Sequence, residues 1–471
     1  MFIGREYELK ELNALYETDI FQMPVVYGRR RVGKSTLIRE FVKGKRCIFY
    51  TAIESSMQRN LELFSKSVFN TLNKEMVGLP GFITFEDAFR YIVKMAKEER
   101  LILVIDEYPY LAAADKSISS LLQKFIDEYF YDTKLFLILC GSSMSFMERQ
   151  VLGYKSPLYG RRTAQFLIRP FDYLISAEFV KEYSNEDKAI VYGITGGIPK
   201  YLELFDSKKS LRDNIINLFL KENGYLYEEP ANLLKQELRD SSRYNLVIEV
   251  IANGASKVSE IASKTHLDTA TVSHCLDSLI ELGIVTREQA ITEENNKKKT
   301  FYLLEDSMFR FWYRFIPNGM DAILSQNGDY LYDEYIEKEL SDYMGRVFEK
   351  MSKQYVMLAN KYEKLPFKVL KIGRWWGNNS LKKREEEIDI VAINMMTKQA
   401  IFAECKYKNA AQGYEILTDL QEKSQLLSQF MQKYYMLFSK SGFTQSLKEE
   451  VFENVILVSL QNMYEIKNES I

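Results

Sequence analysis

Cysteine and histidine are scarce in this 471-residue chain, which contains four cysteines and two histidines. The cysteines show no metal-ligand spacing; they are Cys47, Cys140, Cys275 and Cys405. This pattern argues against a disulfide framework and predicts a reducing, cytoplasmic compartment. His266 and His274 have no metal-ligand constellation around them, so we interpret both as surface or helix-face residues.

Long apolar runs and a charge excess are also missing. No apolar stretch reaches the 18 residues of a membrane span, and charged residues begin at Arg5, so we expect neither secretion nor a membrane partner. The 63 Lys and Arg nearly balance the 65 Asp and Glu. A net charge of −2 argues against a general basic coat for nucleic acid, so any such contact must be local. No repeat or low-complexity linker occurs, and the length predicts three or four domains.

A phosphate-binding loop is the first motif of the sequence. It lies between a β-branched stretch, Pro24 to Tyr27, and a stretch with helical apolar spacing, 36–42. Its glycines let backbone N–H groups surround a phosphate, its lysine reaches the β- and γ-phosphates, and its serine offers a hydroxyl to Mg²⁺. A chance glycine-rich turn is the alternative. The predicted nucleotide-binding residues are Gly28, Arg29, Arg30, Arg31, Val32, Gly33, Lys34, Ser35 and Thr36.

A second motif follows the apolar run Leu101 to Ile105, which predicts a strand buried on both faces. Asp106 and Glu107 come directly after it, at the edge where ligands bind in open α/β sheets. Asp106 fits an acid on the Mg²⁺ side, and Glu107 fits a base that orients the attacking water, which favours hydrolysis over binding alone. An ordinary solvated turn is the alternative.

Further polar residues follow a third apolar run, 135–140. Ser142 is positioned either to contact the γ-phosphate or water, or to cap a following helix. Arg161 and Arg162 are candidates to neutralise charge in the transition state, in cis or in trans, although surface arginines are common.

These motifs recur in one order that resembles the archaeal-type ATPases of the AAA+/STAND group, which also occur in bacteria. The resemblance covers roughly the first 240 residues and rests on segments 2–6, 26–35, 105–107, 141–143, 159–162 and 196–201. It implies a nucleotide-binding αβα domain followed by a small helical lid, with the segment Gly4 to Glu6 near the adenine pocket.

The middle of the chain predicts a winged helix-turn-helix. Helical spacing covers 245–252, 258–264 and 269–282, and β-like segments 284–288 and 300–304 enclose a tip with Lys297, Lys298 and Lys299. A DNA-binding version would present Thr269, Thr271, Ser273 and His274 to the major groove. Residues 243–304 carry a net charge of −1, which favours a packing or partner module slightly over DNA binding.

The C-terminal third carries a second set of chemical residues. Candidate strands cover 367–373, 387–393 and 400–406, with Asp389 in the second and Glu404 and Lys406 in the third. Residues two apart on a strand share a face, so Glu404 and Lys406 converge. Asp389 and Glu404, joined by Glu349 from a preceding helix, would hold Mg²⁺ or Mn²⁺, and Lys406 would position or activate water.

This arrangement resembles the PD-(D/E)XK nuclease superfamily from about Ser341 onward, including a helix over 413–430 and a strand over 435–438. The proline usual before the first acid is replaced by Ile388. Gln421, Lys423 and Gln425 are candidates to assist. Chance placement of these residues, or a fold that has lost cleavage, are the alternatives.

Nearby charge favours a nucleic-acid surface, since 361–384 holds eight Lys and Arg against one Glu. Trp375 and Trp376 lie inside this stretch and either stack on bases or pack under the sheet, with packing favoured.

Together these observations predict a multidomain α/β protein: a P-loop ATPase core (1–170), a helical lid (171–240), a winged helix-turn-helix (241–305), a connector (306–340) and a restriction-endonuclease-like domain (341–471). We expect ATP and Mg²⁺ as cofactors and nucleotide-controlled, metal-dependent cleavage of DNA. The alternative is a nucleotide-controlled switch whose C-terminal domains only bind DNA or a protein. The sequence leaves open a homo-oligomer and an RNA target.

Overall fold

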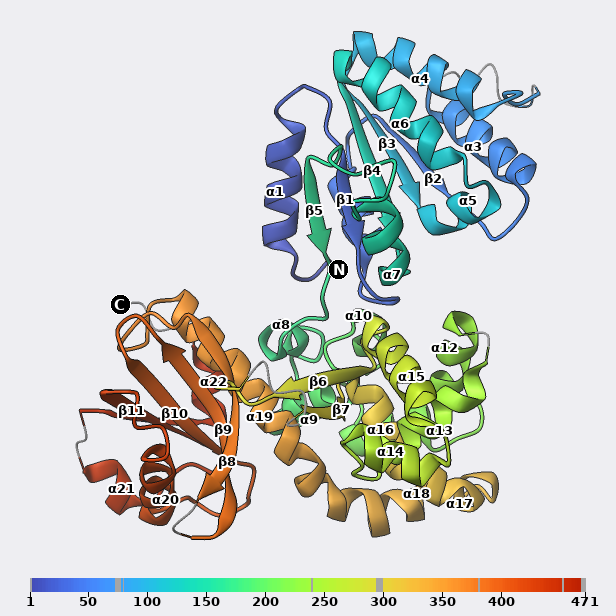
Figure 1. Cartoon of the computed structure of the whole chain (residues 1–471). Helices are drawn as coiled ribbons and strands as arrows, with labels where there is room; N and C mark the ends of the chain where they lie inside the picture. Colours follow the sequence, from blue (N-terminus) through green and yellow to red (C-terminus); the bar gives the residue numbers. More distant parts are fainter. Residues whose placement is uncertain are drawn as a thin grey trace. The chain divides into compact units, whose positions relative to one another are not determined.

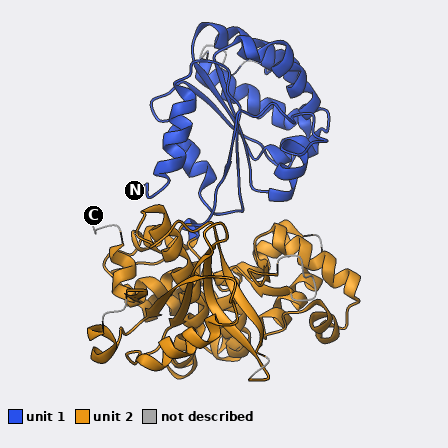
Figure 2. Ribbon diagram, turned by 60° about the vertical axis from the view of Figure 1, so that its left-hand side comes forward, with its two compact units in different colours: residues 1–170, 198–200 blue, residues 171–197, 201–471 orange. Residues whose placement is uncertain are grey.

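The computed structural model describes residues 2–72, 78, 80–238, 240–293, 300–379, 382–450 and 453–466. The chain forms two compact units, Met1–Pro170 with Ile198–Lys200, and Phe171–Gly197 with Tyr201–Ile471 (Figure 2). It therefore passes from one unit to the other after Pro170, after Gly197 and after Lys200.

The first unit is built on a parallel sheet with the strand order β2-β3-β4-β1-β5 (Figure 1). The strands are β1 (Pro24–Tyr27), β2 (Cys47–Thr51), β3 (Leu101–Asp106), β4 (Leu135–Gly141) and β5 (Ala164–Leu167). Every residue of β1, β3 and β4 is buried, because helices cover both faces of the sheet. The buried strands predicted before and after the phosphate-binding loop are thereby confirmed.

Two hydrophobic cores lie on the two faces of this sheet. On one face Leu12 and Phe41, from α1 and α2, pack with Val104. On the other face Phe64 and Phe125, from α3 and α6, pack within a larger cluster. The helices of this unit are α1 (Glu6–Tyr16), α2 (Lys34–Phe41), α3 (Met57–Leu72), α4 (Phe85–Glu98), α5 (Tyr108–Ala114), α6 (Ile118–Glu128) and α7 (Met144–Phe146).

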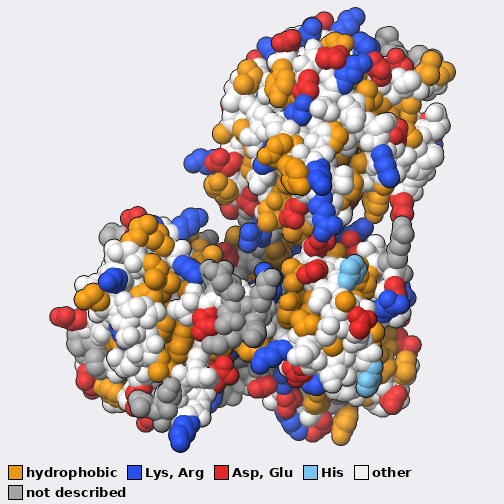
Figure 3. Space-filling model, in the orientation of Figure 1, with side chains coloured by type: hydrophobic (Ala, Val, Ile, Leu, Met, Phe, Trp, Pro, Cys, Tyr) orange, Lys and Arg blue, Asp and Glu red, His pale blue; other side chains and the backbone are white. Residues whose placement is uncertain are grey.

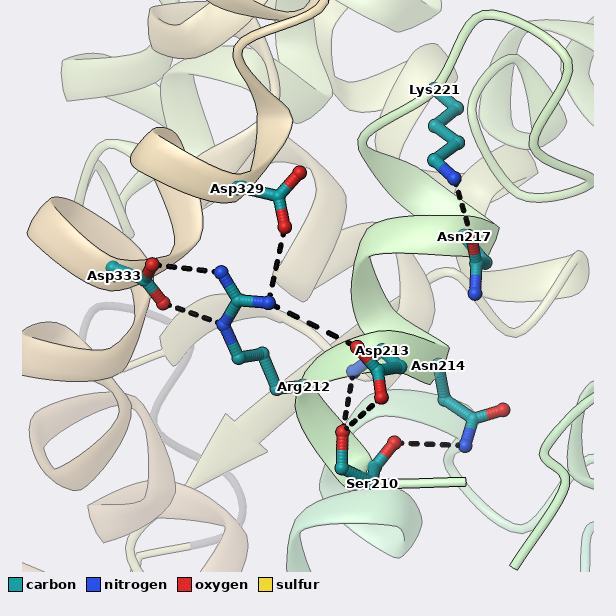
Figure 4. Close-up of polar contacts among 8 residues, drawn as sticks. All are labelled: Ser210, Arg212, Asp213, Asn214, Asn217, Lys221, Asp329 and Asp333. Atoms are coloured by element: carbon teal, nitrogen blue, oxygen red, sulfur yellow. Dashed lines mark hydrogen bonds and ion pairs between the residues drawn. The ribbon is translucent and has the colours of Figure 1, made fainter. Parts of the chain in front are cut away.

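Short helices open the second unit. They are α8 (Tyr173–Ala177), α9 (Asn185–Thr195), α10 (Pro199–Leu202), which straddles the last passage between units, α11 (Leu211–Phe219) and α12 (Glu229–Glu237). Later helices α16 (Ser307–Phe315), α17 (Met320–Leu324) and α18 (Gly328–Leu331) return to them. Arg212 of α11 forms ion pairs with Asp333, at 2.7 Å, and Asp329, at 3.1 Å, and so joins α11 to the segment that follows α17 (Figure 4).

The predicted helix-turn-helix and wing strands are present. They are α13 (Ser241–Ala252), α14 (Val258–Thr265), α15 (Thr269–Glu281) and the antiparallel pair β6 (Val285–Gln289) and β7 (Thr300–Leu304). Asp268 caps α15, since its carboxylate accepts a hydrogen bond from the Thr271 backbone N–H at 2.8 Å. Lys297, Lys298 and Lys299 lie outside the described residues.

The C-terminal domain is a mixed sheet with the order β12-β11-β10-β9-β8. Strands β8, β9 and β10 are antiparallel neighbours, whereas β11 and β12 continue parallel to β10. The elements are α19 (Glu337–Lys361), β8 (Lys371–Asn379), β9 (Arg384–Asn394), β10 (Gln399–Lys406), α20 (Tyr414–Ser424), β11 (Gln432–Ser439), α21 (Gln445–Glu449), β12 (Val455–Ser459) and α22 (Leu460–Glu465).

Two predicted boundaries in this domain are wrong. The first strand begins at Lys371 and not at Phe367, and it runs on to Asn379 because Gly377 to Asn379 pair with 384–386 across a hairpin, after a bulge near Gly373. The helix after β10 ends at Ser424, short of the predicted residue 430.

Helix α19 joins the C-terminal domain to α9. The Tyr343 hydroxyl donates to the Gly193 carbonyl at 2.7 Å, and Gln354 Nε2 donates to the Tyr192 hydroxyl at 2.8 Å. A Cβ built on Gly193 would lie 2.8 Å from the Met344 sulfur, so the two helices touch closely. Within the described residues we found no helix with the length and apolar character needed to cross a bilayer.

Candidate functional site

The loop between β1 and α2 has the backbone shape that its glycines predict. Gly33 has φ +86°, a left-handed value that a side chain disfavours. A Cβ on Gly28 would lie 2.3 Å from the Ile168 carbonyl oxygen, so only glycine fits against the neighbouring strand. Arg31, at φ +70°, adopts the left-handed region despite its side chain. The predicted loop is therefore present between a buried strand and a helix N-terminus.

Lys34 is folded back onto this loop. Its Nζ donates to the carbonyl oxygens of Gly28, at 2.9 Å, and Arg29, at 2.8 Å. Burial lowers the pKa of Lys34, while Asp106 and Glu107 act in the opposite direction. A phosphate group that bound this lysine would replace the two carbonyl oxygens as its partner, so Lys34 Nζ would have to turn away from them.

The serine and the acid predicted to hold Mg²⁺ are in direct contact. Ser35 Oγ, in the first turn of α2, donates to Asp106 Oδ2, at the end of β3, at 2.8 Å. Asp106 is 4% exposed. A hydroxyl and a carboxylate form an oxygen-rich donor set that suits Mg²⁺. These two residues fit the predicted metal position beside a nucleotide.

Glu107 contacts Ser142 at the edge of the sheet. The Ser142 hydroxyl donates to Glu107 Oε2 at 2.9 Å, and the Ser142 backbone N–H reaches the same oxygen at 3.3 Å. Ser143, and not Ser142, occupies the N-cap position of α7, and its side chain makes no capping bond. The helix-cap alternative for Ser142 is therefore wrong, and its contact is with the predicted base.

The two arginines after α7 differ in what they contact. Arg161 forms a two-pronged ion pair with Asp127, with nitrogen–oxygen distances of 2.8 and 2.6 Å, and donates to the Pro157 carbonyl at 2.9 Å. Arg162 reaches the Leu152 carbonyl at 3.5 Å, and it counteracts the burial that raises the pKa of Tyr27, next to the loop. Arg161 is therefore held by an ion pair, whereas the printed contact of Arg162 is one long bond to a backbone carbonyl.

Two contacts to the loop were not predicted. Arg30 Nη2 donates to the Tyr110 hydroxyl at 2.9 Å. Arg5, whose side chain is 7% exposed, donates through Nη2 to the carbonyl oxygens of Val32 at 3.1 Å and Arg169 at 2.6 Å. The sequence placed Arg5 in a family motif but gave no sign of its partners. Thr36 lies exposed in the first turn of α2.

The predicted residues of the C-terminal site converge at the adjoining strands β9 and β10. Lys406 Nζ pairs with Glu404 Oε1 at 2.7 Å, and the Cys405 N–H donates to Asp389 Oδ2 at 2.8 Å. Burial, then Glu404, then Glu349 raise the pKa of Asp389 to about 7. Burial alone would lower the pKa of Lys406, but Glu404 raises it. The charges of Asp389, Glu404 and Lys406 therefore act on one another.

Lys423 is the residue of α20 that reaches this group. Its Nζ lies 3.6 Å from Glu404 Oε2 and 2.7 Å from Asp419. Gln425 instead turns to the Gln421 carbonyl, at 3.4 Å. Glu404 Oε2 is buried and accepts no hydrogen bond, which is a position that suits a cation.

Glu349 has a different environment from the one predicted. Burial raises its pKa, and Arg374 and Arg346 oppose that rise, so two guanidinium groups face it. Arg374 also pairs with Glu387. Over the described part of the chain, no three His, Cys, Asp or Glu side chains form a metal-binding group. Glu349 nonetheless contributes to the raised pKa of Asp389, so the trio of Glu349, Asp389 and Glu404 stays a prediction.

Three of the eight basic residues in 361–384 pair with acids outside that stretch. Arg374 pairs with Glu387, Lys382 with Glu422, and Arg384 with Glu386. Figure 3 shows Lys and Arg mixed with Asp and Glu over the visible face of this unit. These pairs reduce the charge excess read from the sequence.

The tryptophans of β8 are packed. Trp375 is 7% and Trp376 4% exposed, and Trp376 lies against Phe301 of β7 with ring centroids 5.0 Å apart. Ile291, which follows β6, joins the hydrophobic core of the C-terminal domain, and its N–H donates to the Arg374 carbonyl at 2.9 Å. The base-stacking alternative is wrong for these residues, which join the wing to β8.

Helix α15 presents the polar side chains that were predicted. Thr269, Ser273 and His274 are exposed, whereas the Thr271 hydroxyl is taken by Asp268 at 2.6 Å. The Asp268 carboxylate stands at the N-terminus of this helix, where it would repel a DNA phosphate.

Comparisons with known proteins bear on these domains separately. Residues 2–205 match a family described as an ATPase domain predominantly from Archaea, and residues 246–289 match the IclR helix-turn-helix domain. An uncharacterized protein, MJECL04 of Methanocaldococcus jannaschii, is 34% identical over 443 residues, which is 93% of this chain and 96% of that protein. The chain belongs to the same family as MJECL04. The predicted archaeal-type ATPase domain and helix-turn-helix are thereby confirmed.

Other relatives match a smaller share of this chain. The uncharacterized ATP-binding protein PYRAB09480 of Pyrococcus abyssi is 28% identical over 43% of this chain and 71% of its own length. The solved Walker-type ATPase PABY2304 of Pyrococcus abyssi has a TM-score of 0.51 and 22% identity, and covers 66% of this chain and 96% of its own. The likeness to this solved structure shows the fold alone.

The C-terminal part of this chain matches a family whose role is unknown. Residues 312–425 match a family described as archaeal and bacterial proteins of unknown function. This match does not identify a nuclease, so nuclease-like chemistry stays a prediction.

Proposed function

We propose that this chain binds ATP with Mg²⁺ and hydrolyses it. The observation that carries the proposal is the 2.8 Å contact between Ser35 Oγ and Asp106 Oδ2, at the mouth of the phosphate-binding loop. Asp106 and Ser35 would hold Mg²⁺, which when bound neutralises phosphate charge. Lys34 would leave its two loop carbonyls for the β- and γ-phosphates.

Glu107 would orient the attacking water, and its hydrogen bond with Ser142 holds it aside from that task. Release of this bond when the γ-phosphate arrives would confine hydrolysis to the loaded site. Arg162, lying near Tyr27 and the loop, would stabilise transition-state charge in cis, since Arg161 is engaged by Asp127. The names of relatives such as PYRAB09480 support ATP as the nucleotide.

We further propose that nucleotide state controls a metal-dependent cleavage of DNA by the C-terminal domain. Asp389 and Glu404 would hold Mg²⁺ or Mn²⁺, which polarises a phosphodiester when bound. Lys406, paired with Glu404, would position or activate water, and Lys423 would assist from α20. Glu404 Oε2 is buried, accepts no hydrogen bond and has the Lys423 ammonium 3.6 Å away, and the pKa of Asp389 is raised; both observations support a cation position there.

One observation favours a second candidate, a nucleotide-controlled switch that binds DNA or a protein without cutting it. Arg374 and Arg346 oppose the burial that raises the pKa of Glu349, so cationic side chains act on the acid that would complete the metal site. In this case α15 would supply the DNA contact through Thr269, Ser273 and His274, and the C-terminal domain would serve for docking.

The deciding experiment incubates the protein with single-stranded, duplex and branched DNA, and with RNA, in Mg²⁺ or Mn²⁺, with and without ATP. Glu404→Ala and Lys34→Ala are the test variants, and Glu415→Ala, an exposed acid on α20, is the matched control. Cutting that is lost in Glu404→Ala but kept in Glu415→Ala supports the nuclease, and its change in Lys34→Ala supports control by ATP. Intact ATP turnover with no cutting on any substrate rejects the nuclease in favour of the switch.

A further inference from the structure

Arg30 lies in the phosphate-binding loop, close to the lysine that would take the phosphates. It is the third residue of the motif that begins at Gly28, and its side chain is half-buried. Burial lowers the pKa of Lys34, and the charge of Arg30 lowers it further, so the two cations act on each other at short range. Like charges repel each other unless an anion lies between them, and the phosphates of ATP are such an anion.

A tyrosine of α5 holds the Arg30 side chain. Arg30 Nη2 donates to the Tyr110 hydroxyl at 2.9 Å. Tyr110 is itself held, because its ring packs partly buried against the larger hydrophobic core and its N–H donates to the Glu107 carbonyl at 3.0 Å. A guanidinium carries five N–H donors, and the bond to Tyr110 uses one of them. Arg30 can therefore keep this bond and contact a phosphate as well.

The turn that carries Tyr110 also carries the candidate base. Glu107 is the N-cap residue of α5, with a left-handed backbone at φ +52°, and Tyr110 follows in the first turn of the helix. Tyr108, between them, is fully buried, and its hydroxyl shares a 2.6 Å hydrogen bond with the Ser119 hydroxyl of α6. One anchored turn thus places both the group that would orient the water and the group that holds Arg30.

ATP hydrolysis develops negative charge on the phosphate oxygens. The water oxygen bonds to the γ-phosphorus while the bond to the bridging oxygen breaks, and the electron pair of that bond leaves on ADP. One proton of the water passes to the Glu107 carboxylate and then to solvent. A guanidinium that is already held in place stabilises this charge without having to be reorganised during the reaction.

We infer that Arg30 is a catalytic residue that stabilises the transition state in cis, and that Tyr110 is its positioning residue. The inference rests on the proposed hydrolysis of ATP and deepens it by placing a charge-stabilising arginine inside the loop. Arg162 would add charge from the segment after α7, whereas Arg161 stays paired with Asp127. An arginine that only held α5 against the loop would affect the binding of ADP and of a transition-state analogue equally.

The experiment compares ground-state and transition-state binding in Arg30→Ala. Steady-state phosphate release gives turnover, and calorimetry gives the affinity for Mg²⁺-ADP alone and for Mg²⁺-ADP with aluminium fluoride, an analogue of the transferred phosphoryl group. We expect ADP affinity within about threefold of the wild type, because the charge develops only in the transition state. Turnover and affinity for the aluminium fluoride complex should each fall by about 10²–10³-fold, less than for a sole arginine finger because Arg162 shares the charge.

Three variants make the test specific. Arg30→Lys keeps the charge but lacks the guanidinium fork, so it should recover part of the turnover that Arg30→Ala loses. Tyr110→Phe removes only the hydroxyl and should slow turnover by about three- to tenfold, as for one lost hydrogen bond, with ADP affinity unchanged. Arg39→Ala is the matched control, because this exposed arginine of α2 lies over the Phe49 ring, 4.2 Å from its centroid. It should change neither turnover nor affinity.

The outcomes separate this inference from the proposed function. Wild-type turnover in Arg30→Ala, or equal losses of affinity for ADP and for the aluminium fluoride complex, overturns the catalytic role of Arg30 while ATP hydrolysis stands. Wild-type turnover in Tyr110→Phe overturns the positioning role of Tyr110. Turnover per chain that rises with the concentration of the wild-type protein indicates an arginine from a second copy and overturns the action in cis. A wild-type chain that does not hydrolyse ATP overturns the proposed function, and the inference fails with it.

Discussion

Asp389 should make the C-terminal domain less stable as the pH rises. Its pKa is raised from 3.8 to about 7 in the folded chain, mainly by burial and then by Glu404. Between about pH 4 and 7 the unfolded chain has lost this proton while the folded chain keeps it, so the free energy of unfolding falls across that window. A pKa difference of this size corresponds to at most about 4 kcal/mol above pH 7, and we expect about 2–4 kcal/mol.

The variant Asp389→Asn removes this ionisation and should flatten the pH dependence. We expect it to be more stable than the wild type by about 2–4 kcal/mol at pH 8 and nearly equal to it at about pH 3.5, below the unfolded pKa. Denaturant unfolding in EDTA, followed by tryptophan fluorescence in a Trp312→Phe background, reports this domain, because Trp375 and Trp376 lie in β8. Glu385→Gln, at an exposed acid of β9, is the control that should keep the wild-type slope. Parallel pH profiles for Asp389→Asn and the wild type would refute the reasoning.

Three further predictions concern other contacts. Gly193→Val should lower the free energy of unfolding by about 1–3 kcal/mol in denaturant titrations, because its side chain would overlap Met344 and Val347. Gly345→Ala is the control: no atom lies within 4 Å of the new Cβ, so it should be neutral or stabilising. Equal effects of the two variants would contradict the packing of α9 on α19. Arg161→Ala should lower the free energy of unfolding by less than about 1 kcal/mol, since its pair with Asp127 is exposed, and should leave ATP turnover nearly intact. Arg162→Ala should slow turnover by about tenfold or more in a steady-state phosphate assay. The reverse ranking of the two variants would exclude Arg162. Ser35→Ala should weaken the Mg²⁺ dependence of nucleotide affinity by about tenfold in calorimetric titrations, and unchanged Mg²⁺ dependence would exclude Ser35 as a ligand.

The sequence predicted best where one residue type has one physical role. Gly28 and Gly33 predict a loop because no side chain fits the former against Ile168, and the latter has a positive φ. The apolar run of β3 predicts a doubly covered strand because each of its residues must be buried. Asp106 and Ser35 could be paired from the sequence, because strand ends of a parallel sheet share an edge.

Where the sequence prediction failed, side-chain partners came from distant segments. Arg374, from a strand, and Arg346, from the same helix, oppose the rise in the pKa of Glu349, and no spacing rule indicates that. The basic excess of 361–384 is reduced for the same reason, since Glu387, Glu386 and Glu422 lie outside that stretch. Trp376 packs on Phe301 across the wing, a contact set by tertiary structure alone.

Arg5 shows the same limit in a favourable case. Its motif was visible, but its bonds to Val32 and Arg169 depend on a left-handed backbone at the start of α1 and on the nearness of β5. Lys423 likewise could not be separated from Gln421 and Gln425 until the orientation of α20 was known.

The central claim is that the first unit hydrolyses ATP through Glu107. The most direct measurement is Mg²⁺-ATP affinity and turnover of Glu107→Gln beside the wild type, since this change keeps the size of the side chain and removes its basic carboxylate. We predict unchanged affinity to within about threefold and turnover reduced by about 10²–10⁴-fold. Turnover equal to that of the wild type, or no binding of ATP by either protein, would contradict the account.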